Sequence, residues 1–254
     1  MDTLTPLPIR PAGPLRRAAA ARVAVWLDRR RTAAETGEPT LGPGLEAALG
    51  GAAGGVQDLL PPPAPGGRSP GRLSAHGTRI TGPVHGPAGY RRLMRRLLSE
   101  AATASPAARP VAIEYSVPAV DALVDARLDL IGGWEAKAMR SRAGIAGAHL
   151  LYDMLLRDLS SPRWAEAIDR GAPAPYLLWS TQPGAGPDRG ADLAQRLLFP
   201  GTAVALSPRA LEAFAQHGVV TGPTALDLAE ALRVARVLDW FGLRLDALDV
   251  QRAP

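Results

Sequence analysis

The side chain with the most distinctive potential chemistry is a lysine, and the sequence holds a single one, Lys137, among 29 lysine and arginine residues. A lysine amine attacks carbonyl carbons and forms a Schiff base when burial or a neighbouring cation lowers its pKa. Lys137 is therefore the only side-chain amine that could do this chemistry. Its surroundings, GGWEAKAMRSR, are those of a polar helix, and charged side chains are usually exposed. The sequence favours a solvated helix residue over a catalytic one.

Asp28 and the pair Ser180 and Thr181 each come at the end of a short apolar run that is typical of a buried strand. Carboxylates transfer protons and hydroxyls bind polar ligands, so both places could line a site. An Asp after a strand is also an ordinary turn or cap residue, and hydroxyls also close strands through local hydrogen bonds. A pocket role and a structural role stay open for all three residues.

Other chemistries have little support in the sequence. The four histidines show no metal-ligand spacing, so no metal site is expected, and the lack of cysteine excludes disulfides and thiolate sites. Gly184, Gly186 and Gly190 imitate a phosphate-binding loop, but Pro187 and the spacing fit neither the dinucleotide nor the Walker pattern. No GxSxG motif indicates acyl transfer.

The formal net charge of +5 can indicate a polyanionic partner. All basic residues except Lys137 are arginines, and with abundant Ala, Gly and Pro this indicates a coding bias, so nucleic-acid binding is not expected. One predicted helix, 90–98, has leucines and a methionine on one face and arginines on the other. Its basic face is either a solvated outer surface or a surface for an anion or a partner.

With 254 residues, 46% of them hydrophobic, the chain can bury one sizeable core. It has no apolar run of about 18 residues, and its first residues do not form a signal-peptide pattern. We expect a protein without membrane contact, located in the cytoplasm.

Strands and helices alternate through the second half of the chain, which predicts parallel βαβ units and an α/β fold. We predict strands at 23–27, 110–117, 175–180 and 202–206. We predict helices at 118–131, 134–158, 162–170, 190–198, 208–217 and 224–242. In the helix 134–158, Gly144 and Gly147 indicate close backbone packing.

Several motifs resemble those of the actinobacterial-type transaldolase family. They follow one another in the family's order, with nearly gapless spacing, and coverage is good from about 111 to 217. The motifs are VAVWLD (23–28), VDALVDARLD (120–129), MRSRAGIAGAHLLY (139–152), SPRW (161–164), LLWST (177–181) and SPRALEAFAQHG (207–218).

The resemblance implies a TIM-barrel-like α/β fold of the class I aldolase type, with an incomplete barrel. The strands that carry the family's Schiff-base lysine and second acid have no counterpart in this sequence. The implied division is 1–57 as the first part of the barrel, 58–87 as a Gly/Pro-rich linker or excursion, and 88–254 as the second part. An open barrel would expose sheet edges, so a partner chain or a second copy could complete it.

The same resemblance places Asp28 at the family's first-strand acid and Lys137 on an outer helix. It puts Glu114 where the family has a serine and Ala119 where it has a phosphate-binding arginine. A carboxylate at this place would repel a phosphate. No cofactor is implied.

Two classes of function follow from this comparison. The favoured one is a transaldolase-family protein of carbohydrate metabolism that is catalytically impaired or inactive, as a ligand sensor, a partner subunit or a degenerate paralogue. The alternative is an active transferase that moves a dihydroxyacetone unit between sugar phosphates. A sugar phosphate or a related small molecule is the expected ligand in either case.

Overall fold

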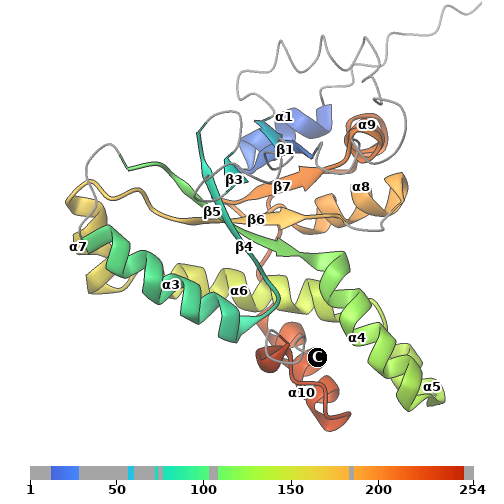
Figure 1. Cartoon of the computed structure of the whole chain (residues 1–254). Coiled ribbons are helices and arrows are strands. Elements are labelled where there is room, and N and C mark those ends of the chain that lie inside the picture. Colours follow the sequence, from blue (N-terminus) through green and yellow to red (C-terminus); the bar gives the residue numbers. More distant parts are fainter. Residues whose placement is uncertain are drawn as a thin grey trace, which may run out of the picture.

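The computed structural model describes residues 13–28, 57–59, 72–73, 77–102, 108–182 and 186–248. In that part of the chain, helices surround a seven-stranded sheet (Figure 1). The strands are β1 (Ala24–Asp28), β2 (Gln57–Leu59), β3 (Arg72–Leu73), β4 (Arg79–Val84), β5 (Val111–Ser116), β6 (Tyr176–Ser180) and β7 (Ala203–Leu206). The helices are α1 (Gly13–Ala20), α3 (Pro87–Ala102), α4 (Val117–Ile131), α5 (Gly133–Ala138), α6 (Ala143–Leu159), α7 (Pro162–Asp169), α8 (Pro187–Arg196), α9 (Pro208–His217), α10 (Leu228–Trp240) and the 3₁₀ turn η1 (Leu245–Ala247).

The strand order is that of a barrel opened at one place. The sheet runs β2-β1-β7-β6-β5-β4-β3, and all neighbours are parallel except β3 and β4. The first strand therefore pairs with the last parallel strand, β7, as in a closed (β/α)₈ barrel. The edge strands of the described sheet are β2 and β3, so the opening lies between them; along the chain, residues 60–78, which include β3, separate β2 from β4. A βαβ unit takes about 30 residues, so this stretch is too short for two further units. The predicted incomplete TIM-barrel-like fold is confirmed.

The two faces of the sheet carry different side chains. Trp26, Ile80, Ala112, Leu178 and Ala205 form one buried cluster, which is the inner face. The alternate residues of the same strands point outward into the main core, among them Leu27, Ile113, Tyr115, Trp179 and Val204. Strands that are buried on both faces read as continuous apolar runs, which is why β5, β6 and β7 were predictable.

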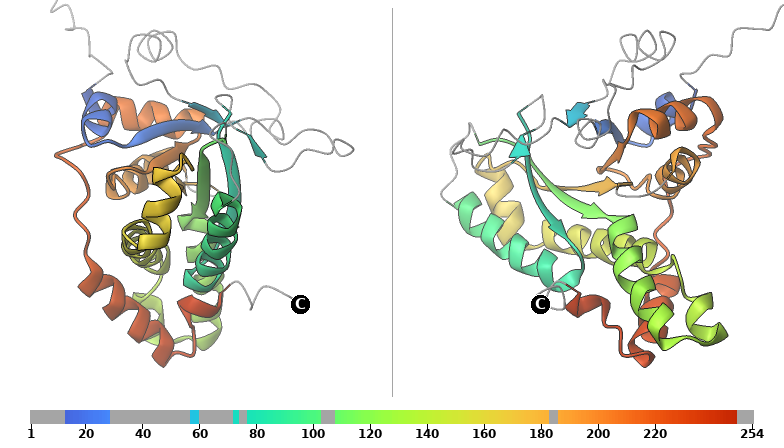
Figure 2. Two further views of the ribbon diagram at one scale, coloured as in Figure 1. Left: turned by 90° about the vertical axis from the view of Figure 1, so that its left-hand side faces the viewer. Right: turned by 45° about the vertical axis from the view of Figure 1, so that its right-hand side comes forward.

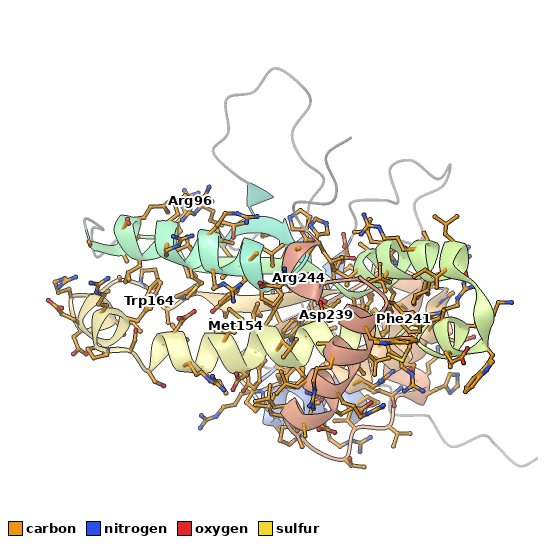
Figure 3. The ribbon with its side chains drawn as sticks, turned by 90° about the horizontal axis from the view of Figure 1, so that it is seen from below. Arg96, Met154, Trp164, Asp239, Phe241 and Arg244 are labelled. Atoms are coloured by element: carbon orange, nitrogen blue, oxygen red, sulfur yellow. The ribbon has the colours of Figure 1, made fainter. Side chains whose placement is uncertain are left out.

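Helices α1, α8 and α9 gather on one side of the molecule, whereas α3, α6, α7 and α10 lie on another (Figures 1 and 2). Helix α3 lies alongside α6 on the lower face (Figure 3), where the Tyr90 hydroxyl donates to Asp158 Oδ2 at 3.0 Å. Asp158, which is half-buried, therefore links the two helices. The basic face of α3 is exposed, as the helical spacing of its apolar residues predicted.

The predicted helix 134–158 is two helices. Helix α5 ends at Ala138, and α6 begins at Ala143 after a turn in which Ser141 has a positive φ of 57°. Asp125 of α4 holds this turn by accepting from the Ser141 amide at 2.9 Å and facing its hydroxyl at 3.3 Å. A tertiary contact thus overrides the local helical preference.

Two further boundaries differ from the sequence prediction. Helix α10 begins at Leu228, not at 224, because Asp227 is its N-cap and accepts from the Glu230 amide at 2.9 Å. The Thr224 hydroxyl instead accepts from the Leu198 amide at 2.9 Å. Helix α8 begins at Pro187 rather than at 190.

Strand β4 was not predicted, since it lies inside the segment 58–87 that sequence assigned to a linker. Much of that segment lies outside the described residues. Gly82 and Pro83 interrupt the apolar run of β4, which hid its strand pattern. Gly82 has φ 111°, and a Cβ there would be 2.9 Å from the Glu114 carbonyl of β5. Glycine therefore allows the two strands to approach.

Candidate functional site

The carboxyl ends of the strands bring together a small group of polar side chains. Asp28, Glu114, Ser116 and Ser180 are all buried, and they share the inward face with Trp26, Ala112 and Leu178 by strand alternation. Ser116 and Ser180 are partners in the β5–β6 register. This is the end of the sheet where barrel active sites form. The structure thus places two of the predicted residues, Asp28 and Ser180, on the face where a site would lie.

The hydroxyls of this group are bonded to the backbone. Ser180 Oγ donates to the Gln182 carbonyl at 3.2 Å and accepts from its amide at 3.3 Å. Ser116 Oγ donates to the same carbonyl and accepts from the Ala119 amide at 3.2 Å, capping α4. Thr181 Oγ1, fully buried, donates to the Ala205 carbonyl at 2.9 Å. These contacts close β6, and a substrate-binding role for Ser180 and Thr181 stays a prediction.

Lys137 lies far from this group in the architecture. It is exposed on α5, and α4 and α5 project beyond the sheet (Figures 1 and 2). No other lysine exists in the sequence. The residue that could form a Schiff base is therefore on the outside of the molecule, in agreement with the outer helix that the sequence predicted.

The inner face of the described strands β1, β5, β6 and β7 carries carboxyl groups and no guanidinium group. Asp28 and Glu114 contribute carboxyl groups, and no arginine occupies an inward-facing position of the described strands β1, β5, β6 and β7. Ala119 lies in the first turn of α4, where it adds no charge. The inward-facing positions of these described strands therefore offer no cationic side chain to a phosphate group.

Sequence reasoning missed His85 as a site residue. It follows β4 directly at the carboxyl end of that strand and is buried. A histidine directly after a strand would have indicated this position. The strand Arg79–Val84 itself was not recognised from the sequence, so the position of His85 was not either. Among the described residues no three His, Asp or Glu side chains are close enough to hold a metal ion.

The most perturbed carboxyl group of the region is Asp121, on the second turn of α4. It is 3% exposed, and burial raises its pKa to about 6, although the Gly144 amide donates to Oδ1 at 2.8 Å and opposes the shift. Oδ2 is buried without a hydrogen-bond partner among the described residues, and the Arg189 guanidinium is 3.8 Å away. Sequence gave no reason to single out this aspartate.

Asp121 is the first of three carboxylates spaced by four residues along α4, within the VDALVDARLD motif. Asp125 holds Ser141, and Asp129 pairs with Arg140 at 2.6 Å. Together they bind the start of α6, where Gly144 packs so closely that a Cβ would be 2.4 Å from the Val117 carbonyl. A Cβ at Gly147 would likewise collide with the Tyr115 hydroxyl oxygen. The predicted close packing at Gly144 and Gly147 is therefore confirmed. We call this contact between α4 and the 139–147 segment the carboxylate ladder.

No helix in the described part of the chain is long and apolar enough to cross a membrane. No protein-family model matches the sequence.

Curated transaldolases do match it. The transaldolase of Parafrankia sp. (strain EAN1pec) is 37% identical over 137 residues, which are 54% of this chain and 37% of that protein. That of Arthrobacter sp. (strain FB24) is 36% identical over 136 residues, covering 53% and 34%. That of Thermobifida fusca (strain YX) is 32% identical over 150 residues, covering 57% and 41%. The chain spans less than half the length of each of these relatives. These identities, with a parallel sheet in barrel order, show that the chain is related to the transaldolase family.

Proposed function

We propose that this protein is a transaldolase relative without transaldolase activity, which serves carbohydrate metabolism as a ligand-sensing or partner-binding protein. The observation that carries the proposal is the position of Lys137. A Schiff-base reaction needs an amine in a poorly solvated site beside the substrate carbonyl. The only lysine is exposed on α5, outside the barrel.

The architecture supports the same conclusion independently. The resemblance implies that the catalytic lysine and the second acid belong to strands that would lie between β2 and β4, and the sequence between these strands, residues 60–78, is shorter than the roughly 30 residues of one βαβ unit. The hydroxyls of Ser116, Ser180 and Thr181 are used to close β6. The hydroxyls of Ser116 and Ser180 at the mouth of the barrel remnant thus bind the backbone that follows β6, at Gln182.

The decisive experiment is reductive trapping. The protein is incubated with fructose 6-phosphate and borohydride, and intact mass and peptide mapping of Lys137 are followed beside a coupled assay of transaldolase turnover. We expect neither an adduct nor turnover. The transaldolase of Thermobifida fusca, treated identically, is the positive control. A stoichiometric adduct that Lys137→Ala abolishes, together with turnover, would establish the active transferase instead.

A partner that completes the barrel is part of the proposal. Among the described strands, β3 pairs with β4 only at Arg79 and Ile80, so Thr81–Val84 has no strand on that side in the described structure. Parallel edges are sites for pairing with another chain. Sedimentation equilibrium should show a self-associating species, and a strictly monomeric protein across the micromolar range would exclude the homo-oligomeric form of this idea.

A further inference from the structure

A polar cavity of about 460 Å³ lies outside the barrel, where three distant parts of the chain meet. The turn between α5 and α6 supplies Arg140 and Arg142, α8 supplies Arg196, and α10 begins on the opposite side with Asp227 and Glu230. His149 of α6 also lines it. None of these residues belongs to the inner face of the sheet.

The charges around this cavity are unevenly compensated. Arg140 is engaged by Asp125 and Asp129, and Glu230 forms a two-pronged contact with Arg233 at 2.6 and 2.7 Å. Asp227 uses Oδ1 to cap α10. Within the described structure, Arg142 and Arg196 form no ion pair. Arg142 interacts electrostatically with Glu230 only at longer range. The same holds for Arg196 with Asp121 and His149. In the described structure two guanidinium groups and one carboxylate, that of Asp227, are therefore without an ion pair at the cavity, which leaves an excess of positive charge.

His149 adds a neutral donor to the same wall. Its Nδ1 accepts a hydrogen bond from the Asp227 amide at 3.1 Å, so in the neutral ring the proton is on Nε2. Burial lowers the pKa of His149, which keeps the ring neutral at physiological pH. The ring is fixed edge-on against Phe199, with centroids 5.0 Å apart. The tautomer and the orientation of this donor are therefore both set by the protein.

We propose that this cavity binds the phosphate group of a small phosphate ester through Arg142, Arg196 and His149. Guanidinium groups form paired hydrogen bonds with phosphate oxygens, and a neutral N–H completes the set. The volume accommodates a ligand of the size of a sugar phosphate. The site is separate from the barrel mouth and goes beyond the proposed function, since it exists whether or not the barrel is catalytic.

Binding would tie α8 to α6 and α10, which pack against each other but have few contacts with α8. The ligand would bridge the start of α6, the end of α8 and the start of α10, the last of which rests on the Asp227–His149 contact. A ligand that binds only the folded state also stabilises it in proportion to its affinity. Phosphate should therefore raise the melting temperature.

The test is calorimetric titration at constant ionic strength, with inorganic phosphate and with ribose 5-phosphate as separate probes. We expect saturable binding of ribose 5-phosphate, weakened about tenfold by Arg142→Ala or Arg196→Ala and lost in the double variant, because each removes one charged hydrogen-bond donor. Stronger binding of the ester than of inorganic phosphate would identify an ester site; equal binding would reduce it to a site for free phosphate and overturn the ester assignment.

The control is the double variant Arg163→Ala/Arg209→Ala, which removes the same net charge from exposed positions on α7 and α9. It should bind like the wild type. The double variant Arg142→Lys/Arg196→Lys keeps both charges but loses the paired guanidinium hydrogen bonds. It should bind with intermediate affinity, and such binding would show that the variant is folded. Absence of binding by the wild type, or unchanged binding by the double alanine variant, would refute the proposal. Neither readout depends on transaldolase turnover.

Discussion

The carboxylate ladder and the mouth of the barrel remnant both hold buried polar side chains, but they use different groups for different contacts. In the ladder, Asp121, Asp125 and Asp129 hold the turn and the start of α6 through short, specific contacts. At the mouth, the hydroxyls of Ser116 and Ser180 close a loop. The family motif is most recognisable where it joins helices. Sequence similarity here therefore reports a shared scaffold more directly than a shared reaction.

The strongest way to break the ladder is to fill its closest approach. Gly144→Ala would place a methyl group 2.4 Å from the Val117 carbonyl, and backbone cannot yield cheaply. We expect a loss of more than about 3 kcal/mol in the free energy of unfolding, measured with urea. Gly222→Ala, where a Cβ meets nothing within 4 Å, is the matched control and should stay within about 0.5 kcal/mol. Equal effects would show that the close contact between α4 and α6 is not needed.

A subtler change tests the electrostatic cost of the ladder. The pKa of Asp121 is raised from 3.8 to about 6 in the folded state, so the folded protein binds the proton more tightly than the unfolded chain. Its contribution is most favourable below pH 3.8 and is lost as the pH rises through 6, by about 3 kcal/mol in total.

Asp121→Asn keeps an oxygen for the Gly144 amide and removes the charge. We expect this variant to be more stable than the wild type at pH 8 and equally stable at pH 4, by chemical denaturation across the pH range. A variant that is destabilised equally at both pH values would mean that the charge is compensated in the fold.

Asp125→Ala tests the second carboxylate of the ladder. It removes the acceptor of the Ser141 amide and the nearby charge for Arg140, and should cost about 2 kcal/mol because an amide loses its partner. Glu166→Ala, which removes only an exposed i,i+4 partner of Arg170, should cost about 0.5 kcal/mol or less. If the two substitutions cost the same, the ladder contributes no more than an ordinary surface pair.

The smallest expected effect is that of Lys137→Ala. An exposed helix residue far from the barrel should change the unfolding free energy by less than about 0.5 kcal/mol and leave ligand binding unaltered. Thermal melts and the ribose 5-phosphate titration measure both quantities. A large loss of stability or of ribose 5-phosphate binding would mean that Lys137 has a structural or binding role.

Sequence predicted the elements whose signal is local. The runs that became β5, β6 and β7 are buried on both faces, and Ser207 before Pro208 marked the start of α9 correctly. It did not reveal the break before α6, which Asp125 imposes from another helix. It also missed β4, where Gly82 and Pro83 interrupt the apolar pattern.

The same division holds for functional residues. Asp28, Ser180 and Thr181 could be placed at strand ends from their neighbours in sequence. The raised pKa of Asp121 arises from its burial in the folded protein, and the fixed tautomer of His149 arises from a contact with an amide 78 positions away. No local pattern encodes such contacts, so both groups became visible only in the folded structure.

The pairing of β1 with β7 has a consequence for how the chain reaches its fold. In the described sheet, β7 is the strand that joins β1 and β2 to β6, β5 and β4. A nascent chain that has not yet emerged beyond Leu206 has its first two strands without their neighbour. Contacts of such long sequence separation slow folding, because the loop must close before the pairing stabilises it. Assembly of the sheet therefore waits until residues 203–206 have left the ribosome.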